Sequence, residues 1–106
     1  MPQFAVYRNR NAATKARFPL LLDVQTDLLE ELGTHVVIPL APASAAAKRT
    51  TMQTLTPICT IEDKPYVLMT PQLAGIAAKE LGPPVALLTC DRQAVIAALD
   101  LLFTGI

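Results

Sequence analysis

The sequence predicts an α+β fold in which a small, mostly antiparallel β-sheet is followed by a C-terminal α-helix. Short apolar segments separated by turn residues fill the chain up to Leu88, and a segment with helical spacing comes last. This order is typical of an antiparallel sheet with a helix packed beside it. The 106 residues are 52% apolar, so we expect a single domain over residues 1–106 with a core of its own.

The first two predicted strands are Gln3–Tyr7 and Phe18–Val24. In the first, polar and apolar side chains alternate around Phe4 and Val6, as in a short strand. The second is partly apolar on both faces, until Asp23 interrupts it.

Between these strands, residues 8–17 lose all periodicity, and we expect an exposed, mobile loop. The loop holds four of the nine basic residues of the chain: Arg8, Arg10, Lys15 and Arg17. Two interpretations stay open, a solvated hairpin loop and a docking site for an acidic partner segment.

The second strand is followed by a short turn that Asp27 can cap. Leu28 and Leu29 are adjacent, so both cannot face one core, and at least one is expected at the surface or in an interface. Asp23 and Asp27 share this stretch, and we interpret the two carboxylates as part of a solvated turn.

The third predicted strand is Thr34–Leu40, with Pro39 at or near its end because proline cannot donate to a β-ladder. His35 is expected to face solvent or a neighbouring residue. No Cys, His or Asp set at metal-ligand spacing surrounds it, so we predict no metal site and no cofactor.

The middle of the chain combines a connector with a hairpin. Residues 41–56 are low in complexity and are expected to form a loose connector. Ile58–Ile61 and Tyr66–Met69, joined by a turn at Glu62–Pro65, are typical of a β-hairpin that Pro71 ends.

The segment before the final helix is ambiguous. Leu73–Leu81 is a weak apolar run that suits a strand or a helix, and Gly82–Pro84 is predicted to break it before Val85–Leu88.

The final segment predicts an amphipathic helix that Thr89 or Asp91 can cap. Gly105 lies where a helix usually turns left-handed and ends. Ile106, which follows it, is expected either to cover a core edge or to be presented to a partner. The apolar stripe of the helix is formed by Val95, Ala98, Leu99 and Leu102.

The composition excludes several function classes. The chain has nine basic and nine acidic residues, and this net charge of zero argues against sequence-independent binding to nucleic acid. The sequence lacks nucleotide-binding and hydrolase motifs, and its only serine, Ser44, lies in the loose connector. No signal peptide or membrane span is evident, so we expect a cytoplasmic protein with free buried thiols at Cys59 and Cys90. The high apolar content favours a dimer or a larger assembly.

A collinear series of short segments resembles the CcdB family of bacterial toxins. The resemblance extends over essentially the whole chain, and residues 8–17 look slightly longer than in plasmid-borne members. The segments are Q-F-x-V-Y at residues 3–7, DVQTD at 23–27 followed by two aliphatic residues, VIPL at 37–40, Pro57-Ile58, the hairpin over 61–70 and the terminal helix with Gly105-Ile106.

The resemblance implies a homodimer with an SH3-like barrel of the CcdB/MazF type. It implies a non-enzymatic toxin that binds the A subunit of DNA gyrase and traps the enzyme on cleaved DNA. A CcdA-type antitoxin would neutralise the toxin and supply the promoter DNA contact. The loop residues Arg8, Arg10 and Lys15 are the candidates for antitoxin binding. The gyrase-binding positions carried over from the family are Leu28, Leu29, Asp100, Thr104, Gly105 and Ile106.

Two of these positions depart from the best-known plasmid pattern, which has a tryptophan in place of Thr104 and an asparagine in place of Asp100. The ending Thr-Gly-Ile is similar to that of chromosomal members. Two alternatives remain: a degenerate homologue that binds antitoxin without poisoning gyrase, and a MazF-like ribonuclease that would use Arg8, Arg17 or Arg49.

Overall fold

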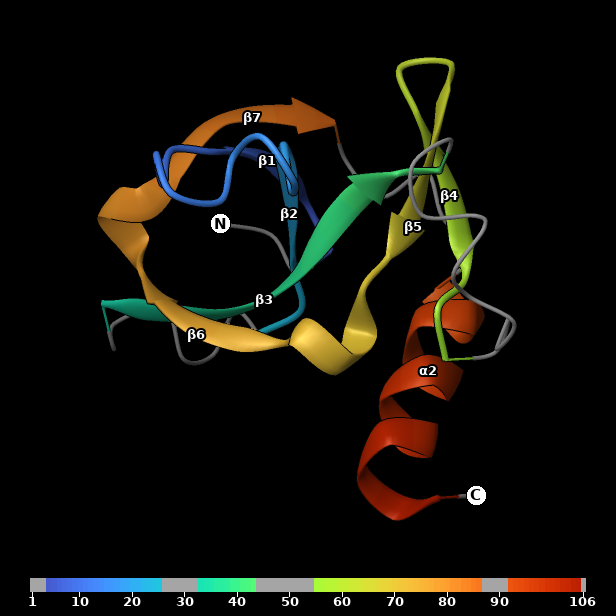
Figure 1. The fold of residues 1–106 in the computed structure, drawn as a ribbon. Coiled ribbons are helices and arrows are strands. Elements are labelled where there is room, and N and C mark those ends of the chain that lie inside the picture. The colour runs from blue at the N-terminus through green and yellow to red at the C-terminus, as the bar shows by residue number, and fades with distance from the viewer. Residues whose placement is uncertain (1–3, 26–32, 44–54, 87–91, 106) are drawn as a thin grey trace.

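The computed structural model describes residues 4–25, 33–43, 55–86 and 92–105, and it confirms the α+β prediction. Seven antiparallel strands form one sheet in the order β4-β5-β3-β2-β1-β7, and β6 also pairs with β3 (Figure 1). The helix α2 (Arg92–Thr104) closes the described chain. The strands are β1 (Val6–Asn9), β2 (Leu20–Asp23), β3 (Thr34–Pro42), β4 (Ile58–Ile61), β5 (Lys64–Leu68), β6 (Ala74–Ala77) and β7 (Leu81–Ala86).

The first strand begins later than the alternation in the sequence predicts. Phe4 has a φ of +66° and therefore cannot be part of a regular strand, so β1 starts at Val6 and continues to Asn9. Phe4 and Val6 still share one buried cluster, as predicted. The strand extends into the predicted loop because Arg8 pairs with Leu20 of β2.

Pro39 does not end the third strand, contrary to the prediction. Thr34–Val37 pairs with β6, and Leu40–Pro42 pairs with β5. Pro39 lies between these two pairings, and its carbonyl oxygen accepts a hydrogen bond from the Met69 N–H at 2.9 Å. A residue without an N–H is tolerated at this point because β3 changes partner there.

The predicted hairpin is confirmed as β4 and β5, with a tighter turn than expected. Ile61 pairs with Lys64, so that Glu62 and Asp63 alone form the turn, both with positive φ. Two consecutive residues with positive φ are the geometry of a type I′ turn, which suits the twist of a hairpin.

The ambiguous segment is neither one strand nor one helix. It contains β6, a short 3₁₀ turn (Ala78–Glu80) and the start of β7. The prediction that Gly82–Pro84 breaks the chain is wrong, because these residues lie within β7. Consecutive residues of a strand point to opposite sides, so one proline is tolerated because β7 is at the edge of the sheet, where one side needs no donors. The other is tolerated because register shifts interrupt the pairing of β7 with β1 at this point.

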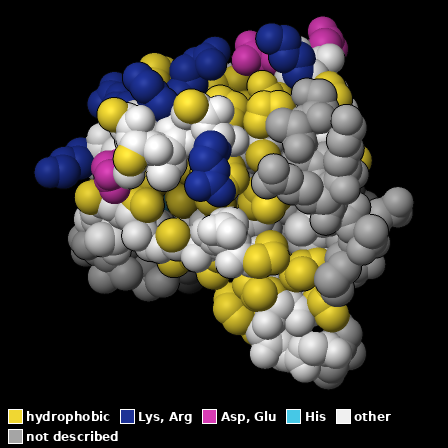
Figure 2. Space-filling model, viewed as in Figure 1, with side chains coloured by type: hydrophobic (Ala, Val, Ile, Leu, Met, Phe, Trp, Pro, Cys, Tyr) yellow, Lys and Arg dark blue, Asp and Glu magenta, His cyan; other side chains and the backbone are white. Residues whose placement is uncertain are grey.

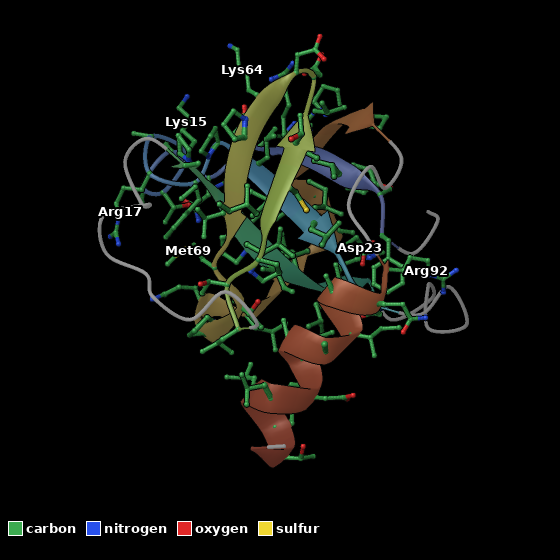
Figure 3. All side chains as sticks on the ribbon, turned by 90° about the vertical axis from the view of Figure 1, so that its right-hand side faces the viewer. Lys15, Arg17, Asp23, Lys64, Met69 and Arg92 are labelled. Carbon is green, nitrogen blue, oxygen red and sulfur yellow. The ribbon has the colours of Figure 1, made fainter. Side chains whose placement is uncertain are left out.

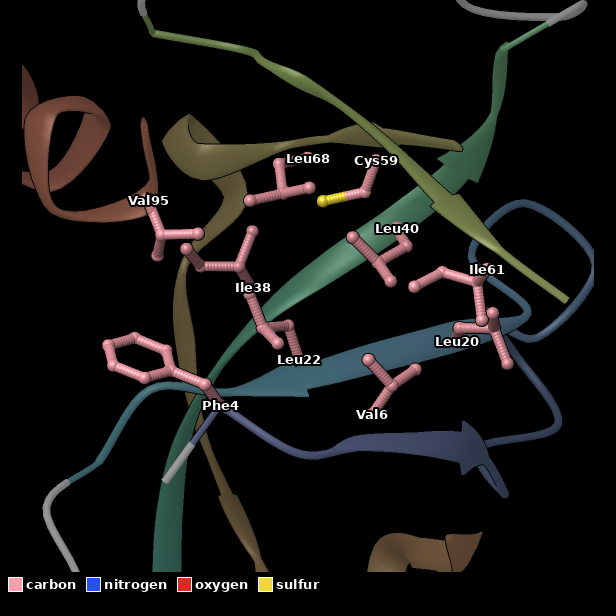
Figure 4. Packing of buried hydrophobic residues seen from close by; sticks show 10 residues of the cluster. All are labelled: Phe4, Val6, Leu20, Leu22, Ile38, Leu40, Cys59, Ile61, Leu68 and Val95. Atoms are coloured by element: carbon pink, nitrogen blue, oxygen red, sulfur yellow. The ribbon is translucent and has the colours of Figure 1, made fainter. Parts of the chain in front are cut away.

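The sheet is apolar on both faces, which explains the continuous apolar run of β2. Alternate residues of β2 point to opposite sides: Leu20 and Leu22 join one cluster, and Leu21 joins the other. The first cluster lies between the sheet and α2, where Val95 packs near Ile38 (Figure 4). The second cluster, on the far face, contains Ala5, Tyr7, Leu21, Val37 and Leu81.

The helix prediction is confirmed over Arg92–Thr104, and the proposed caps Thr89 and Asp91 lie outside the described residues. Gly105 has a φ of +73°, and its N–H donates to the carbonyl oxygen of Leu101 at 3.0 Å. This is the left-handed helix end that the sequence predicts. Within the described residues, no helix is long and apolar enough to cross a membrane.

The prediction of free thiols is wrong for Cys59, which is buried and disulfide-bonded. Cys90, the only other cysteine of the sequence, lies outside the described residues. The prediction depends on the expected compartment, which does not report how close two cysteines lie in a fold.

Candidate functional site

The C-terminal end of α2 presents an exposed tip that projects from the sheet (Figure 1). Asp100, Thr104 and Gly105, three of the predicted gyrase-binding residues, are all exposed there. The Thr104 hydroxyl donates to the carbonyl oxygen of Asp100 at 2.6 Å, and the helix ends at Gly105. The structure therefore brings these three residues together. Leu28, Leu29 and Ile106 lie outside the described residues.

Phe103 also belongs to the tip, although the sequence pattern does not single it out. Its side chain is 68% exposed, the largest value among the exposed large apolar residues of the described chain. Ile96, seven residues earlier on the same helix, is 39% exposed. The spacing of seven places both on one face, which lies outside the predicted apolar stripe. Two apolar residues that are seven positions apart and do not belong to the predicted stripe are the sequence signal that could have identified this face.

A buried polar network lies beside the start of the undescribed segment 26–32. Asp23 is 1% exposed, and its Oδ2 lies 2.8 Å from His35 Nδ1. Its Oδ1 accepts the Gln25 N–H at 3.0 Å. The interpretation of Asp23 as part of a solvated turn is therefore wrong, whereas Asp27 lies outside the described residues. His35 is buried and faces a neighbouring residue, which was one of its two predicted environments.

Gln25 extends this network to the next strand. Its side-chain amide donates to the carbonyl oxygen of Thr34 at 2.9 Å, and its Oε1 accepts the Val36 N–H at 3.2 Å. The network thus fixes the chain at residue 25, three residues before the predicted contact residue Leu28. These contacts give the DVQ motif a structural role, because they tie Asp23 and Gln25 to β3.

Phe4 connects this network to the helix. Its N–H donates to the Asp23 carbonyl oxygen at 2.6 Å, and the Asp23 N–H donates to the carbonyl oxygen of Ala5 at 3.0 Å. The Arg92 guanidinium lies 5.1 Å from the centre of the Phe4 ring. Figure 3 shows Asp23 and Arg92 close to the first turn of α2. The end of β2 and the start of α2 are therefore held together through one aromatic side chain.

The basic residues of the loop at 8–17 lie away from the tip. Arg8, Arg10, Lys15 and Arg17 are all exposed, as predicted, and Figure 2 shows basic side chains gathered on the part of the surface far from the tip. Figure 3 shows Lys15 and Arg17 on the opposite side of the sheet from α2. Arg8 is engaged in a weak, exposed ion pair with Glu62 at 3.6 Å, and Arg17 lies over the Phe18 ring at 5.1 Å.

The loop is better ordered than its composition indicates. The Asn9 side-chain amide donates to the Thr14 hydroxyl at 3.0 Å and to the Phe18 carbonyl oxygen at 2.9 Å. Asn9 Oδ1 in turn accepts the Asn11 N–H at 2.9 Å. A buried Asn thus closes the loop on itself, and the loop presents its cations from a fixed base.

A comparison with known protein families identifies the family of the chain. Residues 3–105 match the family described as CcdB protein. The chain belongs to the CcdB family. The match includes the tip at Gly105, the DVQ motif and the basic loop, so every described candidate site lies inside it.

CcdB-family toxins are non-enzymatic gyrase poisons. No group of three or more His, Cys, Asp or Glu side chains suited to a metal occurs in the described part of the chain. Arg8 and Arg17, two of the three arginines that a MazF-like ribonuclease would use, contact Glu62 and the Phe18 ring at the surface. The third, Arg49, lies outside the described residues, and so does Ser44.

Proposed function

We propose that this CcdB-family chain is the toxin of a type II toxin–antitoxin system that binds the A subunit of DNA gyrase and traps the cleaved-DNA complex. The observation that carries the proposal is the family match over residues 3–105, which contains the exposed helix tip. An exposed tip with apolar and hydrogen-bonding groups is suited to binding a partner protein, and such binding is the first step of gyrase poisoning.

The contact surface is proposed to combine Asp100, Thr104, Gly105 and Ile106 with Leu28 and Leu29. Thr104 replaces the tryptophan of the plasmid pattern, so the tip needs another aromatic anchor. Phe103 is the neighbouring residue and is 68% exposed. Aromatic residues are frequent hot spots of interfaces, and an aromatic side chain that remains exposed in the free protein gains most from burial.

The remaining parts of the proposal concern assembly. We infer a homodimer, neutralisation by a CcdA-type antitoxin with contacts at Arg8, Arg10 and Lys15, and contact with promoter DNA only through that antitoxin. The exposed Ile96 and Phe103 and the zero net charge support a protein that binds proteins rather than DNA. The cytoplasm, where gyrase acts, is the proposed location, and the Thr-Gly-Ile ending favours a chromosomal-type member.

A cleavage assay tests the proposal. Supercoiled plasmid, purified gyrase, ATP and the full chain are incubated, and the products are then treated with detergent and protease. We expect linear DNA, and we expect a variant that lacks Gly105 and Ile106 to yield none while keeping its circular dichroism spectrum and oligomeric state. The matched control is Lys15→Ala, an exposed change in the loop that should leave the yield of linear DNA unchanged.

The second candidate, a degenerate homologue that binds antitoxin alone, is favoured by one observation, the threonine at position 104. A folded wild-type chain that yields no linear DNA would support this candidate and overturn gyrase poisoning.

A further inference from the structure

A pocket of about 220 Å³ lies on the far face of the sheet from α2, under the loop at residues 8–17. Its floor is apolar and includes Leu21, Val37 and Ile76, which come from three different strands. Its rim is polar and includes Asn11, Gln72 and Glu80. Drug-sized ligands fill about 300–1,000 Å³. This pocket is smaller, so it suits one side chain or a fragment.

The walls of the pocket are held in place before any ligand arrives. Asn9 and Thr14, which both line the pocket, are joined by the hydrogen bond at 3.0 Å described above. The Asn9 amide also holds the carbonyl oxygen of Phe18, a third lining residue. A preformed pocket spares a ligand the entropy cost of ordering the loop.

Among the described residues that line the pocket, Glu80 is the only ionisable one. Its side chain is partly buried, and its carboxylate has no ion pair or hydrogen bond with the described residues. Its backbone oxygen is engaged, since it accepts the Arg10 N–H at 3.2 Å. By contrast, the exposed Glu62 pairs with Arg8. A partly buried carboxylate beside an apolar floor favours a ligand that combines an apolar stem with a cationic head.

We propose that this pocket binds one arginine side chain of a partner peptide. The three-carbon stem of arginine would lie on the apolar floor, and its planar guanidinium would meet the Glu80 carboxylate at the rim. Arginine suits such a site better than lysine because its guanidinium is more weakly hydrated and binds a carboxylate through two parallel hydrogen bonds.

The same peptide would carry acidic residues beside that arginine. Arg10 and Lys15 do not line the pocket, but both are exposed cations of the loop that covers it, and each is next in sequence to a lining residue. This inference rests on the proposed docking of an antitoxin at the loop, and it specifies a peptide of mixed charge in place of a purely acidic one.

The test uses n-butylguanidine as a probe for the arginine side chain and n-butylurea as its neutral counterpart. Each is titrated into the full ¹⁵N-labelled chain, and amide chemical shifts are followed. We expect n-butylguanidine to shift residues around Leu21, Ile76 and Glu80, with an affinity about tenfold higher than that of n-butylurea.

Two variants distinguish the contribution of the Glu80 charge to binding from that of the free volume of the pocket. Glu80→Gln should lower the affinity for n-butylguanidine about tenfold, to that of n-butylurea. Ala74→Leu, which adds bulk at an exposed lining position, should weaken both probes. The matched control is Glu62→Gln at the hairpin turn, which should change neither affinity. Equal binding of the two probes, or an unchanged preference in Glu80→Gln, would overturn the proposal.

Neither gyrase nor antitoxin enters this titration, so its failure is distinguishable from failure of the proposed function. If the wild-type chain traps gyrase on DNA but does not prefer the guanidine, only the pocket proposal is wrong. If the chain prefers the guanidine but traps no gyrase, only gyrase poisoning is wrong.

Discussion

At the scale of single residues, Asp23 illustrates why the sequence predicts a buried polar network poorly. The carboxylate interrupts an apolar strand, which in most sequences marks a turn at the surface. Here His35, twelve residues away, and the Gln25 N–H satisfy its oxygens, so its burial is tolerated. His35 comes from the next strand, and its proximity depends on the pairing of β2 with β3.

Replacing Asp23 should therefore destabilise the fold. Asp23→Ala leaves His35 and the Gln25 N–H without their acceptor in a buried site. We expect a loss of about 3 kcal/mol in the free energy of unfolding, measured by urea denaturation. The control is Asp100→Ala, an exposed aspartate on α2, which should change stability by no more than about 0.5 kcal/mol. Equal effects of the two changes would refute the role of the network.

Gly105 is the second residue whose conformation matters. At a φ of +73°, a side chain is strained even though nothing lies within 4 Å of the position of its Cβ. Gly105→Ala should raise the energy of the observed helix end by about 1 kcal/mol and lower the yield of linear DNA in the gyrase assay. Gly75→Ala is the matched control, because a Cβ there is equally unobstructed and φ is not positive. The outcome that contradicts this prediction is an unchanged yield with Gly105→Ala.

At the scale of elements, the sequence predicts β2, the hairpin and α2 well because each follows from local patterns. The bounds of β1 and the course of residues 73–86 are predicted poorly, because they depend on partners. Val6 pairs with both Leu22 and Ala86, and β7 tolerates two prolines because it lies at an edge and its pairing with β1 is irregular. Local periodicity carries no information on which strand ends up at an edge.

The residues of the candidate site also fall into two groups, those that local sequence patterns predict and those that depend on packing between distant segments. Gly105 and the exposed Asp100 and Thr104 follow from the helical pattern together with the family resemblance. In the sequence, Phe103 is indicated only by its spacing of seven from Ile96. The pocket beside Glu80 could not be predicted, since it depends on which segments pack against one another. The pocket joins residues from the loop, β2, β3 and β6, which lie up to 71 residues apart in the sequence, from Asn9 to Glu80.

At the scale of the whole molecule, the disulfide at Cys59 contributes to stability. Cys59 lies in the cluster that packs between the sheet and α2. A cross-link that closes a loop of tens of residues stabilises a fold by about 2–4 kcal/mol. We therefore expect a reductant such as tris(2-carboxyethyl)phosphine to lower the Tm by several degrees, measured by calorimetry.

The control for this experiment is the double variant with Cys59→Ala and Cys90→Ala, whose Tm should not respond to the reductant. If the wild-type Tm is likewise insensitive, the disulfide has no part in the stability of the protein.

The two prolines of β7 have a consequence for aggregation. The described sheet ends in β4 on one side and β7 on the other. Pro83 and Pro84 are consecutive, so one of them faces the open edge and leaves a strand from another molecule without a donor at that point of β7. No proline interrupts β4, and its Ile58 is 60% exposed. With no net charge to keep molecules apart, edge-to-edge growth in concentrated solution should begin at the hairpin, where a single lysine in place of Ile58 would oppose it.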